Sequence, residues 1–192
     1  MPKTSTKKIE SNSAGQERSR PSQHEHFMNL AKVVAERSTC LRRRIGAIIV
    51  DKEGVQLSSG YSGAPRDAEH CTEIGKCLRM ELNIPSGQNY ELCRSVHAEQ
   101  NAIINAARTG VSIVGGKMYI SSEKLDGAYA NGSKRKKIYG PCIICKKEII
   151  NAGLKKVYMK EEGVGERRYT IGRIKKLLAA EEAKWRKKYN LA

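Results

Sequence analysis

The chain has 192 residues and a formal net charge of +16, and 39% of its residues are hydrophobic. This length suits one domain of ordinary size, and no apolar run approaches the roughly 18 residues of a transmembrane helix. The first 23 residues lack the apolar segment of a signal peptide, so we expect a soluble, cytoplasmic protein with no membrane partner. In such a reducing compartment the six cysteines favour metal binding or chemistry over disulfides.

The N-terminal part of the chain predicts an arm, a helix and a hairpin. Residues 1–23 are polar and basic, and we expect them to be disordered. Apolar residues at helical spacing then predict a helix over 24–38. A β-branched run predicts a strand over 45–50, which a turn at 51–54 joins to an antiparallel strand over 55–60.

The remainder alternates helices and strands. We expect a loop-rich segment over 61–93, a helix over 97–108, a strand over 117–122 and a polar insertion over 123–140. A helix entered through Pro141 over 142–151, a strand over 156–160 and a basic amphipathic helix over 166–192 should follow. This order predicts an α/β domain over 24–165 in which helices cover a sheet. Strands joined through a helix should pair in parallel.

Positive charge is concentrated at the C-terminal end. Residues 134–192 carry 18 Lys and Arg against six acidic residues. This asymmetry points to a nucleic-acid or phosphate partner, and a solvated basic face on the terminal helix is the simpler alternative.

Three potential metal ligands open two of the predicted helices. Cys142 and Cys145 stand at i and i+3 in the first turn of one helix, so both thiolates face the same side. The positive end of the helix dipole favours thiolates there. His97 opens the other helix and offers a third ligand, which leaves the fourth position of a tetrahedral zinc ion open to water, as in a catalytic site.

Glu99 follows His97 by two residues and is the predicted catalytic proton carrier. It would take a proton from zinc-bound water as hydroxide forms, and then deliver protons to the ring nitrogen and the departing amine of a base. Zinc lowers the pKa of its bound water to about 7. His-x-Glu together with Pro-Cys-x-x-Cys is a known signature of zinc deaminases. The alternative, a closed structural zinc site, needs a fourth ligand and leaves Glu99 without a role.

In these motifs the chain resembles the cytidine deaminase superfamily and, within it, the deoxycytidylate deaminase family. The similarity covers about residues 24–160 and is carried by five segments: residues 38–40, 44–50, 60–66, 97–103 and 142–153. It implies a three-layer α/β/α cytidine deaminase-like fold with a mixed central sheet. It also implies hydrolysis of dCMP to dUMP and ammonia, a homo-oligomer (often a hexamer) and a nucleotide effector.

Two departures from the family pattern concern the substrate. Ser62 stands where family members usually have the Asn of a Gly-Tyr-Asn-Gly stretch that helps hold the sugar. The insertion at 123–140 interrupts a stretch in which relatives usually run straight from the strand into Pro-Cys, and it should lie at the lip of the pocket.

The phosphate contact is predicted from arginines that resemble positions near the nucleotide in relatives. These are Arg42, Arg43 and Arg44 before the first strand and Arg66 after the sugar loop. One guanidinium can grip a monophosphate in bidentate fashion. We take Arg43 and Arg66, with Ser62, as the candidate substrate contacts; for each arginine a plain surface position is the alternative.

Four further cysteines suggest a second, structural zinc, as in some deoxycytidylate deaminases that this chain resembles. The candidate ligands are Cys71, Cys77 and Cys93 with either Cys40 or His70. A long loop of low apolar content gains stability from such a metal clip. Ordinary buried or free thiols are the alternative.

Three functions compete at this point. The first is a zinc-dependent hydrolase that deaminates dCMP or a close relative. The second is an enzyme that deaminates a base within RNA or DNA, as tRNA adenosine deaminases do; the basic C-terminal third fits it, but an aromatic content of 5% offers few stacking platforms. The third is a non-enzymatic, zinc-stabilised nucleic-acid-binding module, which would have no need of Glu99.

Overall fold

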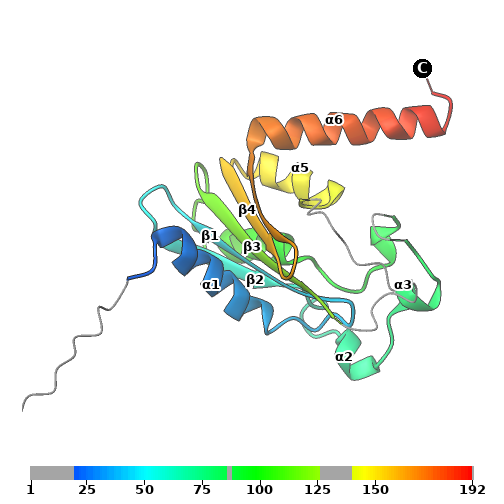
Figure 1. The fold of residues 1–192 in the computed structure, drawn as a ribbon. Helices are drawn as coiled ribbons and strands as arrows, with labels where there is room; N and C mark the ends of the chain where they lie inside the picture. The colour runs from blue at the N-terminus through cyan, green and yellow to red at the C-terminus, as the bar shows by residue number, and fades with distance from the viewer. Residues whose placement is uncertain (1–19, 86–87, 126–139, 192) are drawn as a thin grey trace, which may run out of the picture.

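The computed structural model describes residues 20–85, 88–125 and 140–191. In these ranges five strands form one mixed sheet in the order β2-β1-β3-β4-β5, with helices on both faces (Figure 1). In chain order the elements are α1 (Gln23–Ala35), β1 (Arg43–Val50), β2 (Gln56–Tyr61), α2 (Cys71–Ile74), α3 (Leu78–Glu81), the 3₁₀ helix η1 (Tyr90–Leu92), α4 (Ala98–Arg108), β3 (Lys117–Lys124), α5 (Ile143–Asn151), β4 (Lys156–Glu161), β5 (Gly165–Thr170) and α6 (Ile171–Lys188).

The middle of the domain is a strand whose side chains are buried on both faces. Ile48 and Val50 of β1 point into a cluster with α1, whereas Ala47 and Ile49 point into the main core with α4 and α5. Successive side chains of a strand alternate between faces, so α1 and the α4–α5 pair lie on opposite sides of the sheet. The predicted α/β/α layering with a mixed sheet is confirmed.

One of the two predicted parallel pairings is wrong. β3 and β4, joined through α5, pair in parallel as expected. β2 and β3, joined through α4, do not pair with each other, because β3 pairs antiparallel with β1 and β1 lies between them. A strand buried on both faces belongs in the interior of a sheet, and pairing β2 with β3 would have left β1 at an edge.

The C-terminal helix begins later than predicted. Residues 165–170 form β5, an edge strand that pairs antiparallel with β4, and α6 starts at Ile171. Tyr169 is the buried side chain of β5, and the polar sequence around it gave no strand pattern. The side chain of Thr170 accepts a hydrogen bond from the backbone N–H of Arg173 and so begins α6. The helix packs on α5, and its far end extends beyond the rest of the domain (Figure 1).

Close contact between β2 and α4 positions the first turn of α4. A Cβ atom at Gly60 would collide with the backbone of Ala102 and of Ala98, so only glycine lets the two backbones approach this closely. The N-terminus of α4, which carries the predicted site residues, is thereby held against the sheet.

Some predictions fall wholly or partly outside the described residues. Residues 1–19 of the predicted arm and 126–139 of the predicted insertion lie there, while Lys124 ends β3. The division of the chain at 23/24 and 165/166 stays a prediction. Within the described ranges, no helix combines the length and apolar character needed to cross a membrane.

Candidate active site

The two helices that carry the predicted metal ligands are joined by hydrogen bonds from the first turn of α4 to α5. His97 is the N-cap of α4, and its backbone N–H donates to Oε1 of Gln100 at 3.0 Å. The amide of Gln100 in turn donates to Oε1 of Glu148 in α5 at 2.8 Å. This chain of two hydrogen bonds fixes the start of α4 relative to α5.

His97, Cys142 and Cys145 meet at these helix starts. Nδ1 of His97 lies 3.3 Å from Sγ of Cys142 and 3.4 Å from Sγ of Cys145. The three ligand atoms lie within 4.8 Å of one another. Zinc bonds of about 2.3 Å to sulfur and 2.1 Å to nitrogen in tetrahedral geometry require a nitrogen–sulfur spacing of about 3.5 Å. The donor types and their spacing therefore fit a zinc ion.

Proton affinities within this cluster differ from those of isolated side chains. Burial acts to lower the pKa of His97, but hydrogen bonds to the thiols of Cys142 and Cys93 outweigh it and raise the pKa to about 11. The hydrogen bond between the two thiol groups lowers the pKa of Cys142 and raises the pKa of Cys145. Cys142 thus loses its proton readily, and the thiolate is the form that binds metal.

Glu99 lies in the first turn of α4, and only 5% of its surface is exposed. Burial is the main cause of a pKa above the usual range of a glutamate, and the nearby imidazole of His97 opposes it. A buried carboxyl beside a metal cluster can both accept and release a proton, as a general acid–base must.

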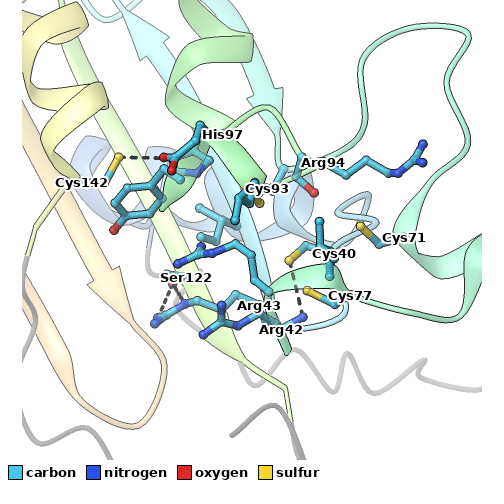
Figure 2. A pocket seen from close by; sticks show the side chains of 18 of the residues that line it. Cys40, Arg42, Arg43, Cys71, Cys77, Cys93, Arg94, His97, Ser122 and Cys142 are labelled. Carbon is cyan, nitrogen blue, oxygen red and sulfur yellow. Dashed lines mark hydrogen bonds between the residues drawn. The ribbon is translucent and has the colours of Figure 1, made fainter. Parts of the chain in front are cut away.

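The cluster opens into a cavity of about 650 Å³. Figure 2 shows His97 and Cys142 at one side of it, with Cys93 between them and a group of other cysteines and arginines. Its lining includes the site residues His97, Glu99, Cys142 and Ser62, the cysteines Cys40, Cys71, Cys77 and Cys93, and the cations Arg42, Arg43, Lys76, Arg79 and Arg94.

Two of the three candidate substrate contacts line this cavity. Ser62 is buried, with 4% of its surface exposed. Arg43 also lines the cavity, but its guanidinium is already held: Nη2 donates to Oγ of Ser122 at 2.7 Å and pairs with the buried Glu161 carboxylate at 2.8 Å. Arg43 thus links β1 to β3 and β4.

The third candidate lies elsewhere. Arg66 is not among the lining residues, and its guanidinium donates to Oδ1 of Asn105 at 3.0 Å on the exposed surface. Arg44 likewise pairs with Glu123 outside the cavity, whereas Arg42 lines it.

The four remaining cysteines come together around the same cavity. Cys40, Cys71 and Cys77 lie near one another beside Arg42 (Figure 2), and no cysteine of the chain forms a disulfide. Within the described residues, only the His97 cluster brings three donor atoms within 4.8 Å, so these four thiols are more widely spaced. His70 points elsewhere, because its Nδ1 lies 3.1 Å from Oγ1 of Thr39.

Sequence reasoning missed two residues that stand beside the cluster. The ring of Tyr90 lies 5.3 Å from the imidazole of His97, and the guanidinium carbon of Arg79 lies 5.0 Å from the Tyr90 ring centroid. Both come from the loop-rich segment, where no periodicity or spacing marks a side chain as facing the site.

Comparison with known families decides the wider assignment. A family model described as the cytidine and deoxycytidylate deaminase zinc-binding region matches residues 21–161, which is more than half of the chain. The chain belongs to this deaminase family. The match confirms the resemblance, and the zinc-binding region confirms zinc as the predicted cofactor. It includes all three residues of the metal cluster together with Glu99.

Relatives of this deaminase chain include the deoxycytidylate deaminase of Schizosaccharomyces pombe, 32% identical over 73% of this chain and 37% of the relative. ComE operon protein 2 of Bacillus subtilis is 32% identical over 74% of this chain and 61% of its own length. The chain thus spans less than two thirds of either relative. The deoxycytidylate deaminase of Mycobacterium phage D29 is 29% identical over 75% of this chain and 98% of its own.

The fold is also similar to that of a solved dCMP deaminase. The crystal structure of the dCMP deaminase of cyanophage S-TIM5 in complex with dCMP and dUMP matches with a TM-score of 0.53 and 25% identity. That match covers 84% of this chain and 93% of the phage chain.

Proposed function

We propose that this chain is a zinc-dependent hydrolase that deaminates dCMP to dUMP and ammonia. The observation that carries the proposal is the buried Glu99 carboxyl, which lines the same cavity as the His97–Cys142–Cys145 cluster. A structural zinc site has no need of a buried acid at its side. The names of the deoxycytidylate deaminase relatives and the nucleotide complex of the phage enzyme support dCMP as the substrate.

The chemistry requires one water per turnover. Its oxygen bonds to C4 of the cytosine ring, and the exocyclic amine leaves from that carbon as ammonia. A zinc ion on His97, Cys142 and Cys145 supplies the Lewis acidity that makes water a nucleophile at neutral pH. Glu99 would accept the two protons of this water in turn, passing the first to N3 of the ring and the second to the departing amine.

The direct test is a substrate panel on the purified protein. Absorbance change is followed with dCMP, dCTP, deoxycytidine and a cytosine-containing oligonucleotide in parallel. We expect dCMP to have the highest kcat/KM. Turnover of the oligonucleotide alone contradicts the proposal and favours the enzyme that acts within a nucleic acid, and no turnover of any substrate favours the non-enzymatic module.

We also propose a second, structural zinc held by Cys71, Cys77, Cys93 and Cys40. Burial is the main cause of the raised pKa of Cys71, and the other three thiols raise it further through their charges. Such mutual repulsion between thiolates is what a metal ion relieves. Cys40 is a better fourth ligand than His70, whose ring already meets Thr39.

Metal analysis tests the second site separately from the first. We expect two zinc ions per chain in the wild type, and one each in Cys77→Ser and Cys142→Ser. One zinc per chain in the wild type, unchanged in Cys77→Ser, rules the second site out.

We further propose assembly into a homo-oligomer and binding of a nucleotide effector, as the family resemblance implies. Sedimentation velocity tests the first proposal, which a monomer contradicts. The kinetics of dCMP deamination test the second, which identical kinetics with and without deoxynucleoside triphosphates contradict.

A further inference from the structure

A buried arginine in the cavity has no acidic partner among the residues that the structure describes. Arg79 in α3 has only 6% of its surface exposed. Its Nη2 donates to the carbonyl oxygens of Gln88 at 2.6 Å and Pro85 at 3.3 Å. Its Nε is buried without any acceptor, and within the described ranges no carboxylate pairs with it. A buried cation that lacks a counter-charge is costly and calls for an anionic ligand.

The position of this guanidinium relates it to the metal cluster. Arg79 and His97 both contact the Tyr90 ring: its centroid lies 5.0 Å from the guanidinium carbon of Arg79 and 5.3 Å from the His97 ring, which it meets edge-on at 78°. Arg79 and His97 line one cavity. Because both contact one aromatic ring, the guanidinium of Arg79 lies close enough to His97 for a single mononucleotide to reach both.

The exposed and ion-paired arginines are weaker candidates for an anion. Arg43 is neutralised by Glu161, and Arg94 is exposed and donates to the carbonyl of Glu69 at 3.2 Å. Arg66 lies outside the cavity. Arg79 lines the cavity as Arg43 and Arg94 do, but unlike these three arginines it is buried and keeps a donor without an acceptor.

We propose that Arg79 binds the 5′-phosphate of the substrate and so makes the enzyme prefer a nucleotide to a nucleoside, with Tyr90 holding the guanidinium in place. This inference rests on the proposed dCMP deaminase activity. Hydrogen bonds between a guanidinium and a phosphate are charge-assisted and about twice as strong as neutral ones. Loss of such a contact should weaken phosphate-dependent binding by about 10- to 100-fold.

The test compares nucleotide with nucleoside in matched variants. Arg79→Met removes the charge, Arg79→Lys retains it, and Arg108→Met changes an exposed arginine outside the cavity. The measurements are KM and kcat for dCMP and deoxycytidine, and dissociation constants for dUMP and deoxyuridine by calorimetry. In Arg79→Met we expect KM for dCMP and the dissociation constant of dUMP to rise by about 10- to 100-fold. Both nucleoside values should stay unchanged, Arg79→Lys should recover part of the loss, and Arg108→Met should match the wild type.

Two results overturn the inference. One is a loss of binding and turnover in Arg79→Met that is equal for nucleotide and nucleoside, together with lost zinc or a lower melting temperature. That result would make Arg79 a support for the loop or a counter-charge to the Cys93 thiolate. The other is that the ratios of KM and of the dissociation constant between nucleotide and nucleoside are the same in Arg79→Met as in the wild type. Failure of the proposed function is a separate result: a wild type that does not turn over dCMP still reports, through dUMP binding, whether Arg79 recognises the phosphate.

Discussion

At the scale of single residues, the candidate site places an acid and a metal ligand two positions apart on one helix. His97 caps α4 and faces the thiols, while Glu99 is enclosed in the first turn with 5% of its surface exposed. The same helix start therefore supplies both a ligand and a proton carrier. Their separate roles predict that one can be removed without the other.

Glu99→Gln should separate metal binding from proton transfer. Glutamine keeps the shape of the side chain but cannot carry the proton, so we expect zinc content to stay normal and kcat for dCMP to fall by at least about 100-fold. Zinc is measured by elemental analysis and turnover by absorbance. The matched control is Glu53→Gln on the exposed turn after β1, which should behave as wild type. Near-normal turnover in Glu99→Gln contradicts the proton-carrier role.

At the scale of secondary-structure elements, α4 and α5 depend on a contact between their side chains. Gln100 accepts from the His97 backbone and donates to Glu148, whose second oxygen is buried without a partner. Groups that orient metal ligands in this way typically change metal affinity when they are lost.

Gln100→Leu should therefore loosen the metal cluster without touching a ligand. We expect zinc affinity to fall by about 10- to 100-fold, measured by competition with a chelator. Gln56→Leu on the exposed part of β2 makes the same chemical change where no such contact exists, and it should leave the affinity unchanged. Equal zinc affinities in the two variants would show that the contact has no part in holding the ligands.

The attachment of α6 gives a second prediction at this scale. Nζ of Lys146 in α5, with 2% of its side chain exposed, lies 2.5 Å from the Glu181 carboxylate, which is 39% exposed. Glu181→Ala leaves the buried ammonium without its partner, so we expect a loss of about 1–3 kcal/mol in the free energy of unfolding, reduced by the exposure of Glu181. Lys146→Met should cost less because no buried charge remains. Urea denaturation measures both, and equal losses contradict this account.

The elements also show what sequence reasoning could reach. The starts of α4 and α5 were predictable because capping and ligand signals coincide at His97 and after Pro141. β5 was missed because an edge strand with one buried side chain, Tyr169, has no apolar alternation. Arg79 and Tyr90 were missed because their approach to the site depends on how the loop folds back, which no local pattern records. Arg66 was misplaced for the same reason.

At the scale of the whole molecule, the metal cluster connects parts that are distant in sequence. Its ligands come from the start of α4 and the start of α5, with β3 between them in the chain. A zinc ion there acts as a cross-link within the helical layer on one face of the sheet. Because the unfolded chain cannot hold that geometry, the binding free energy contributes directly to the stability of the fold.

Zinc removal should therefore lower the melting temperature of the whole domain. With free zinc at a hundred times its dissociation constant, chelation should reduce the midpoint by about 5–10 °C. Glu99→Gln, which keeps all three ligands, should respond as the wild type does. Cys142→Ser should start lower and respond less, and any response that remains should disappear when Cys77→Ser is added, because the proposed second zinc is then lost as well. A melting temperature that does not change on chelation in the wild type contradicts the view that the cluster supports the fold, whatever its part in catalysis.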